Sequence, residues 1–280
     1  MMSDERAVVI GGGGVAGIAW ANGVIAGLAD AGIDLTAADV YIGTSAGANV
    51  TAQLTSGLTA EELFARQVEP GSQSSEIVPE GNPLDRVWET VVGIIDDSAG
   101  DMAVARRRLG NLALTAETVP ESARRAVIES RLPVHEWPRQ RLLITAVDAE
   151  TGEPRIFDAD SGVTLVDAVT ASSAVPLVWP PHTVDGVRYT DGGVRTSVNA
   201  DLAAGYARVL IIAPLADPAL DAEIAGLIER GARVELIAPD DDAVLAFGAN
   251  PLDTATRVPA AHAGRAQGKS AAAQVARLWN

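Results

Sequence analysis

The chain has 280 residues, of which 48% are hydrophobic and 21% charged, a composition typical of a globular protein with a substantial core. Its formal net charge of −16 argues against nucleic acid as a partner and against electrostatic attraction to an anionic bilayer. It contains no cysteine, which excludes disulfides and thiolate chemistry.

The first part of the chain alternates buried strands with helices. Apolar runs predict strands at residues 6–10 and 40–43, and helical spacing predicts helices at 15–31 and 46–56. Another helix is expected after Thr59, which is a suitable N-cap residue. Strand, helix, strand, helix with short connections is typical of a parallel sheet that helices cover on both faces.

A helical excursion at about 68–132 then interrupts this alternation. Residues 68–83 are rich in Pro, Gly and Ser and are predicted to form a loop. Helices are predicted at residues 84–96, 101–114 and 120–131. The excursion either packs as a peripheral layer on the sheet or forms a lid or a wall for an acyl chain, and the sequence favours neither.

The remaining elements return to the α/β pattern. They are a hairpin of strands at 142–147 and 155–157, a helix at 165–171, a short strand at 187–189, strands at 209–213 and 234–238, a crossover helix at 221–230, and a terminal helix at 260–279. No internal repeat or low-complexity tract divides the chain. We therefore expect one domain over residues 1–280, with a three-layer α/β/α architecture and a mainly parallel central sheet.

Targeting signals are not evident. The N-terminal residues Met1–Arg6 carry neither the basic nor the apolar region of a signal peptide. No stretch approaches the roughly eighteen uninterrupted apolar residues of a membrane-spanning helix. We expect a cytoplasmic protein without a transmembrane segment.

Residues 43–47 read Gly-Thr-Ser-Ala-Gly and lie between a predicted strand and a predicted helix. The G-x-S-x-G pattern is the sequence form of a nucleophile elbow, in which Gly43 and Gly47 let the backbone turn sharply and expose Ser45. Free N–H groups and the positive end of the helix dipole at this point stabilise a developing oxyanion. Because Gly, Ser and Ala are abundant here, the pentad alone also fits an ordinary turn.

Two further motifs belong with this pentad. Residues 11–17 read Gly-Gly-Gly-Gly-Val-Ala-Gly after the first strand, and their backbone N–H groups could cradle an anion. If the first two strands are parallel neighbours, this loop and Ser45 meet at the same carboxyl edge of the sheet. Asp191 ends a short predicted strand and is followed by Gly192 and Gly193.

Together these motifs resemble those of the patatin-like phospholipase family, and the match covers most of the chain. Gly12-Gly13-Gly14-x-x-Gly17 is similar to the family's oxyanion loop, Gly43-x-Ser45-x-Gly47 to its nucleophile elbow, residues 171–176 to its A-S-x-A-x-P loop, and Asp191-Gly192-Gly193 to its D-G-[GA] motif. The motifs occur in the family's order, and jointly they are more specific than any one of them.

The resemblance implies a serine hydrolase of acyl esters, similar to a phospholipase A, that needs neither a metal nor an organic cofactor. It implies Ser45 as the nucleophile and Asp191 as its base, with the N–H groups of Gly12, Gly13 and Gly14 forming the oxyanion hole. The partner is then an acyl-ester or lipid substrate, reached through transient contact with a membrane surface. The oligomeric state is not predicted.

One position departs from the family's pattern. The family usually places Arg or Lys just before the last glycine of the oxyanion loop, where this chain has Ala16. Backbone donors survive that change, whereas a cationic contact with a phosphate head group does not. The sequence therefore predicts an ester substrate and leaves open whether phospholipid is preferred.

A conventional Ser–His–Asp hydrolase is the nearest alternative. Of the three histidines, His262 follows Ser45 and Asp191 in the order found in α/β-hydrolases. However, no strand precedes it, and in that fold the elbow normally follows several strands. His182 is interpreted as a loop residue after two prolines, and His135 carries no supporting motif.

Two other classes of protein are alternatives to a hydrolase. The glycines at 12, 14 and 17 formally match a dinucleotide fingerprint, but that fold needs an acid at the end of the second strand, where this chain has Gly43. A catalytically silent patatin-like module is the other alternative, although Ser45 and Asp191 are both intact. Residues 240–242 are three aspartates, interpreted as a helix-capping loop rather than a metal site.

Overall fold

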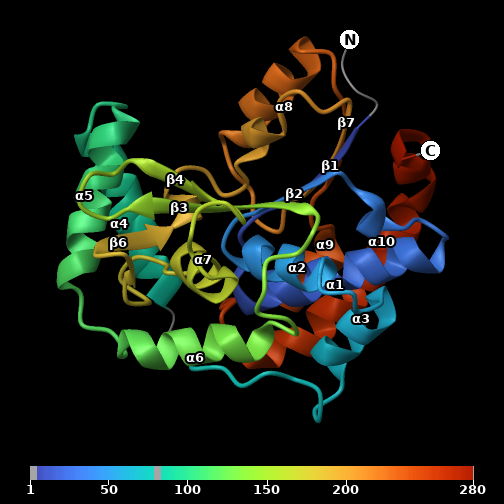
Figure 1. Ribbon diagram of the computed structural model, residues 1–280, viewed down its shortest axis with the longest axis horizontal. Coiled ribbons are helices and arrows are strands. Elements are labelled where there is room, and N and C mark those ends of the chain that lie inside the picture. The colour runs from blue at the N-terminus through green and yellow to red at the C-terminus, as the bar shows by residue number, and fades with distance from the viewer. Residues whose placement is uncertain (1–4, 79–82, 280) are drawn as a thin grey trace.

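The computed structural model describes residues 5–78 and 83–279. Their strands form one eight-stranded sheet in the order β5-β6-β3-β2-β1-β7-β8, with β4 also paired to β3 (Figure 1). The strands are β1 Arg6–Ile10, β2 Val40–Gly43, β3 Arg141–Asp148, β4 Pro154–Phe157, β5 His182–Val184, β6 Val187–Asp191, β7 Arg208–Ile212 and β8 Arg233–Ile237. The run from β3 through β2, β1 and β7 to β8 is parallel, whereas β4, β5 and β6 add antiparallel pairs.

Helices flank both faces of this sheet. They are α1 Gly14–Asp30, α2 Ala46–Leu54, α3 Ala60–Val68, α4 Pro83–Asp97, α5 Met102–Thr115, α6 Glu121–Arg131, α7 Leu165–Ser172, α8 Leu220–Glu229, α9 Asp241–Phe247 and α10 Arg257–Trp279. Side chains alternate along β1, so that Val8 and Ile10 join the core beneath α1 and α10, while Val9 joins a second core beneath α8. The predicted α/β architecture with a mostly parallel sheet is confirmed.

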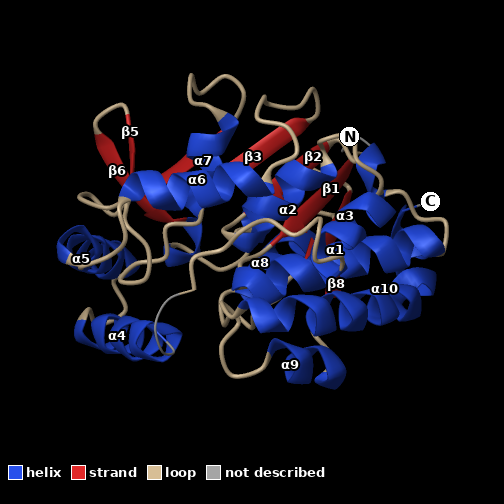
Figure 2. Cartoon of the chain, turned by 90° about the horizontal axis from the view of Figure 1, so that it is seen from below, coloured by secondary structure: helices blue, strands red, loops and turns tan. Residues whose placement is uncertain are grey.

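The closest helix pair is α1 against α10, which lie side by side in both views (Figures 1 and 2). Four glycines line this contact: Gly23 and Gly27 on α1, and Gly264 and Gly268 on α10. A Cβ atom added at any of them would overlap a backbone carbonyl oxygen of the facing helix. The backbones of α1 and α10 are therefore in direct contact. This contact fixes the position of α1, which follows the glycine-rich loop.

The predicted elements agree with the structure to within a few residues, with two differences around the antiparallel pair of β5 and β6. The strand predicted at 187–189 continues to Asp191, because its last residues pair with Ala146 and Val147 of β3. His182, interpreted as a loop residue, begins strand β5 and pairs with Tyr189. Within the predicted loop 68–83, residues 79–82 lie outside the described residues.

The helical excursion has two parts. Helices α4 and α5 contact each other at one end of the molecule, where α5 also contacts β3 (Figure 2). Helix α6 instead packs against α7 and places Ile128 in the main core. Among the described residues, no helix is both long enough and apolar enough to cross a membrane.

Candidate active site

Ser45 lies at the sharp turn between β2 and α2. Its backbone has φ 56° and ψ −115°, a conformation that costs energy for a residue with a side chain and is typical of a nucleophile elbow. A Cβ atom at Gly47 would overlap the Ile10 carbonyl oxygen, and one at Gly43 would press on Ala48. Both glycines are therefore required for the turn to pack against β1 and its own helix.

Polar side chains from neighbouring elements hold this turn in place. The Ser45 N–H donates to the hydroxyl of Ser172 at the end of α7, over 2.9 Å. The amide of Asn49 donates to the Ser45 carbonyl (3.1 Å) and to the Ser173 hydroxyl (3.0 Å). The amide of Asn199 donates to the hydroxyl of Thr44, the residue before Ser45, at 3.0 Å. These contacts over-determine the strained conformation.

Asp191 ends β6 and turns its carboxylate into the interior. One oxygen, Oδ1, accepts a 2.7 Å hydrogen bond from the Gly193 N–H, and the Asp191 N–H donates to the Ala174 carbonyl at 3.0 Å. The adjacent Gly192 has no room for a side chain, since a Cβ atom would overlap the Thr145 hydroxyl of β3. The glycines after Asp191 thus fix the carboxylate at the edge of the sheet.

The electrostatic surroundings of Asp191 are unusual for a carboxylate. Burial raises its pKa to about 7, although the Ser45 hydroxyl, the Gly193 N–H and the charge of Arg124 each act to lower it. The second oxygen, Oδ2, is buried and has no hydrogen bond of ordinary geometry within the described residues. The Ser45 hydroxyl nevertheless lies close enough to this carboxylate to lower its pKa.

The glycine-rich loop passes over the serine. A Cβ atom at Gly12 would lie 3.5 Å from the Ser45 Cβ, so this loop bounds the reaction site directly. The Gly12 N–H, however, donates to the Ser197 carbonyl at 2.8 Å. It is not free to bind an oxyanion, and this part of the predicted oxyanion hole has no support.

Gly13 and Gly14 differ from Gly12 in this respect. Neither of their N–H groups has a hydrogen-bond acceptor among the described residues, and both lie at the N-terminal end of α1. Gly14 has φ 64°, which favours glycine, and a Cβ atom at Gly13 would lie only 2.6 Å from Pro214. Gly17 packs one turn later against the same proline and Ala46, which sets the spacing between the loop and the elbow.

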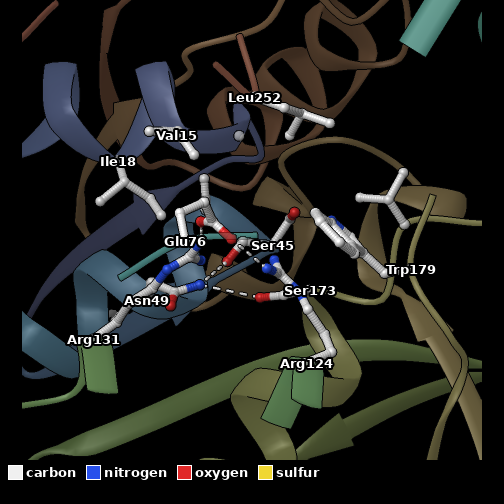
Figure 3. A pocket seen from close by; sticks show the side chains of 13 residues that line it. Val15, Ile18, Ser45, Asn49, Glu76, Arg124, Arg131, Ser173, Trp179 and Leu252 are labelled. Carbon is white, nitrogen blue, oxygen red and sulfur yellow. Dashed lines mark hydrogen bonds and ion pairs between the residues drawn. The ribbon is translucent and has the colours of Figure 1, made fainter. Parts of the chain in front are cut away.

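A narrow pocket leads to Ser45 (Figure 3). Its apolar side is formed by Val15 and Ile18 of α1, together with Trp179 and Leu252. Its polar side is formed by Asn49, Glu76, Ser173, Arg124 and Arg131. The cavity has a volume of about 20 Å³, room for about one water molecule.

Comparison with known proteins bears on this arrangement. The family model of the patatin-like phospholipases matches residues 8–204, which include the glycine-rich loop, the elbow and Asp191. The chain belongs to the patatin-like phospholipase family. No curated protein sequence matches it significantly.

Solved structures with detectable similarity are remote in sequence. VipD from Legionella pneumophila is 11% identical, with a TM-score of 0.48 over 96% of this chain and 67% of VipD. The type III effector ExoU is 13% identical, with a TM-score of 0.41 over 96% of this chain and 53% of that one. ExoU of Pseudomonas aeruginosa in complex with SpcU is 12% identical, with a TM-score of 0.41 over 99% of this chain and 53% of that one. The patatin-like chain thus spans about half the length of ExoU.

The three histidines of this patatin-like chain have other partners. His262 lies on α10 with its ring edge-on to Phe64, 5.4 Å between centroids. The ring nitrogens of His182 lie 3.0 Å from the carboxylates of Glu121 and Asp167. His135 is exposed and contacts the Glu129 carbonyl. None of these contacts involves Ser45 or Asp191.

Carboxylates and histidines do not gather into a metal-binding group of three or more within the described ranges. Asp240 of the aspartate triplet instead caps α9, accepting a 2.9 Å hydrogen bond from the Ala243 N–H, as predicted. The residues that brace the elbow are not predicted by the sequence. Ser172 and Ser173 belong to a motif that resembles the family's A-S-x-A-x-P loop, and no motif includes Asn49 or Asn199.

Proposed function

We propose that this chain hydrolyses carboxylic esters of lipids through a dyad of Ser45 and Asp191. The observation that carries the proposal is a buried carboxylate, whose pKa is raised to about 7, beside a serine on a strained strand-to-helix turn. An ordinary aspartate, with a pKa of about 4, is a poor base toward a hydroxyl group. Burial makes Asp191 a stronger base, matched to neutral pH.

The first half-reaction follows from this geometry. Asp191 accepts the hydroxyl proton as the Ser45 Oγ attacks the ester carbonyl, and the N–H groups of Gly13 and Gly14 receive the oxyanion. The tetrahedral intermediate then collapses, and the leaving alcohol takes the proton from Asp191. This leaves an acyl-enzyme on Ser45.

Water completes the cycle. Asp191 removes a proton from a water molecule that attacks the acyl carbonyl, and the same N–H groups stabilise the second oxyanion. The proton then returns to Ser45 as the fatty acid leaves. No step in this scheme requires a histidine, and we propose that the chain acts as a single domain in the cytoplasm.

Labelling with a fluorophosphonate probe tests the nucleophile. We expect the probe to modify Ser45 and nothing else, and Ser45→Ala to lose both labelling and hydrolysis of short acyl esters. Ser270→Ala, at a serine exposed on α10, is the matched control and retains both. Labelling at another residue would overturn the assignment, and well-folded protein that is not labelled at all would favour a silent binding module.

Replacement of the base tests the other half of the dyad. General-base catalysis contributes about a hundredfold to ten-thousandfold, so Asp191→Asn should lose activity in that range. His262→Ala should retain it, because His262 packs against Phe64. A conventional triad predicts the reverse result for these two variants.

A further inference from the structure

Two buried arginines face the pocket of Ser45. Arg124 and Arg131 lie seven residues apart on α6, which places both on the same side of that helix. Their side chains are only 5% and 6% exposed, and both line the pocket together with the serine. Arg124 also stacks over the ring of Trp179, 3.9 Å from its centroid. Buried guanidinium groups are costly without a counter-charge.

One carboxylate supplies that counter-charge. Glu76, on the loop after α3, reaches between the two arginines with a side chain only 2% exposed (Figure 3). Its Oε1 pairs with Arg124 at 2.8 Å, and its Oε2 pairs with Arg131. Glu76 thereby fills the polar side of a pocket that would otherwise admit a ligand.

Three arginines here face two carboxylates, Glu76 and Asp191, the second of which acts on Arg124 through its charge. Arg257, at the start of α10, lies beside Arg131 and donates to the Ser74 carbonyl at 3.1 Å, with no carboxylate partner among the described residues. The Nε of Arg124 is buried and has no hydrogen-bond partner in the part of the chain that the structure describes. Burial lowers the pKa of both Arg124 and Arg131 to about 9, and the charge of Arg257 adds to the effect at Arg131. A stronger anion than one carboxylate would satisfy this cluster better.

The loop that carries Glu76 is irregular, whereas α6 is packed into the core. Between α3 and Val78 the backbone forms no helix or strand. Besides the two ion pairs, other contacts hold the described part of this loop: Gln73 donates to the Gln67 carbonyl, Arg257 donates to the Ser74 carbonyl, and Ile77 packs against an apolar cluster that includes Trp179. A ligand that replaced the Glu76 carboxylate would therefore have to supply new partners for both arginines.

We propose that Arg124 and Arg131 bind the phosphodiester group of a phospholipid substrate, which replaces the Glu76 carboxylate as the lipid enters beside Ser45. Guanidinium groups match phosphate oxygens through paired, charge-assisted hydrogen bonds. The cation that the family usually carries at the position of Ala16 would be replaced by these two. This inference rests on the proposed function, because it assigns the head group of the ester that Ser45 attacks.

Thermal unfolding in inorganic phosphate tests the anion site independently of catalysis. Glu76→Gln removes the internal anion, so phosphate should raise its Tm by about 5 °C at saturating concentration, against a smaller rise for the natural chain. Chloride at equal ionic strength is the reference. Glu136→Gln, at an exposed glutamate, is the matched control and should respond like the natural chain. Adding Arg131→Gln should abolish the phosphate response.

Hydrolysis of two esters with identical acyl chains tests the head group. One is a phospholipid, and the other is an uncharged diacylglycerol. Arg131→Gln should lower the ratio of their kcat/KM values about tenfold to a hundredfold, as expected for loss of a charged hydrogen bond, and Glu76→Gln should raise it. Arg139→Gln, at an exposed arginine, should leave the ratio unchanged. If Glu76→Gln does not fold, the ester ratio of Arg131→Gln decides alone, and an unchanged ratio overturns the head-group assignment.

The outcomes separate the inference from the function on which it rests. A phosphate response without any change in the ester ratio would mean a site for free phosphate and overturn the head-group assignment. No phosphate response in a folded Glu76→Gln variant, with an unchanged ratio in Arg131→Gln, would reduce the cluster to a structural ion pair. If the natural chain cleaves neither ester while the phosphate response holds, the hydrolase proposal fails and the anion site stands.

Discussion

The Ser45 N–H donates its hydrogen bond to the Ser172 hydroxyl, over 2.9 Å, across the boundary between α2 and α7. The contact is buried and joins the strained turn to the segment that leads toward Asp191. Ala174, two residues after Ser172, accepts the Asp191 N–H at 3.0 Å. Residues 172–174 thus contact both members of the proposed dyad.

Ser172→Ala should therefore impair catalysis without removing any group that reacts. The substitution leaves a buried N–H unsatisfied at the strained residue, which costs about 1–3 kcal/mol and loosens the elbow. We expect kcat to fall about tenfold or more, with a lower Tm and little change in KM. Ser161→Ala, in the loop before α7, is the control. Full kcat in Ser172→Ala would show that the elbow does not depend on this contact.

The pH dependence of hydrolysis should report the raised pKa of Asp191, which is about 7. The base must be ionised, so kcat/KM should rise with pH through a midpoint near 7 and fall on the acid side. The charge of Arg124 lowers this pKa, so Arg124→Gln should move the midpoint upward when an uncharged ester is used. A midpoint near 4, or one that Arg124→Gln leaves in place, would contradict this assignment.

The same carboxylate should limit the stability of the fold. Because the pKa of Asp191 is higher in the folded state than in the unfolded chain, its contribution to stability is full below about pH 4 and is lost as pH rises to about 7. Asp191→Asn cannot ionise and avoids this loss. Its free energy of unfolding should exceed that of the natural chain by a few kcal/mol at pH 8, with the gap closing toward pH 4. Denaturant titrations at both pH values measure this gap.

Local motifs were sufficient to predict the strand-to-helix turn at Ser45 and the strand end at Asp191. The elbow around Ser45 and the strand end at Asp191 depend on neighbours within a few residues, and the glycines there meet steric demands that only glycine satisfies. The parallel pairing of β1 with β2 also follows from the short connection between them.

Contacts between distant segments were not predictable in the same way. Nothing in the sequence distinguishes Gly12 from Gly13 and Gly14, but its N–H donates to the carbonyl of Ser197, which lies between β6 and β7 in the chain. The pairing of Glu76 with the arginines of α6 depends on how the helical excursion docks, and no periodicity encodes that. The sequence predicted three helices there but not which of them would face the serine.

Glycine substitutions test whether steric demands at the elbow are as strict as the backbone geometry indicates. Gly47→Ala should unfold the protein or abolish activity, because its Cβ atom would overlap the Ile10 carbonyl oxygen, and neither the strand nor the helix can move apart without exposing the core. Gly226→Ala, on α8, is the matched control, since open space surrounds that position. It should stabilise the chain by about 0.5–1 kcal/mol through helix propensity. Thermal melts followed by circular dichroism measure the stability of the two variants, and ester hydrolysis measures their activity. A fully active Gly47→Ala enzyme would mean that the turn around Ser45 tolerates a side chain at position 47.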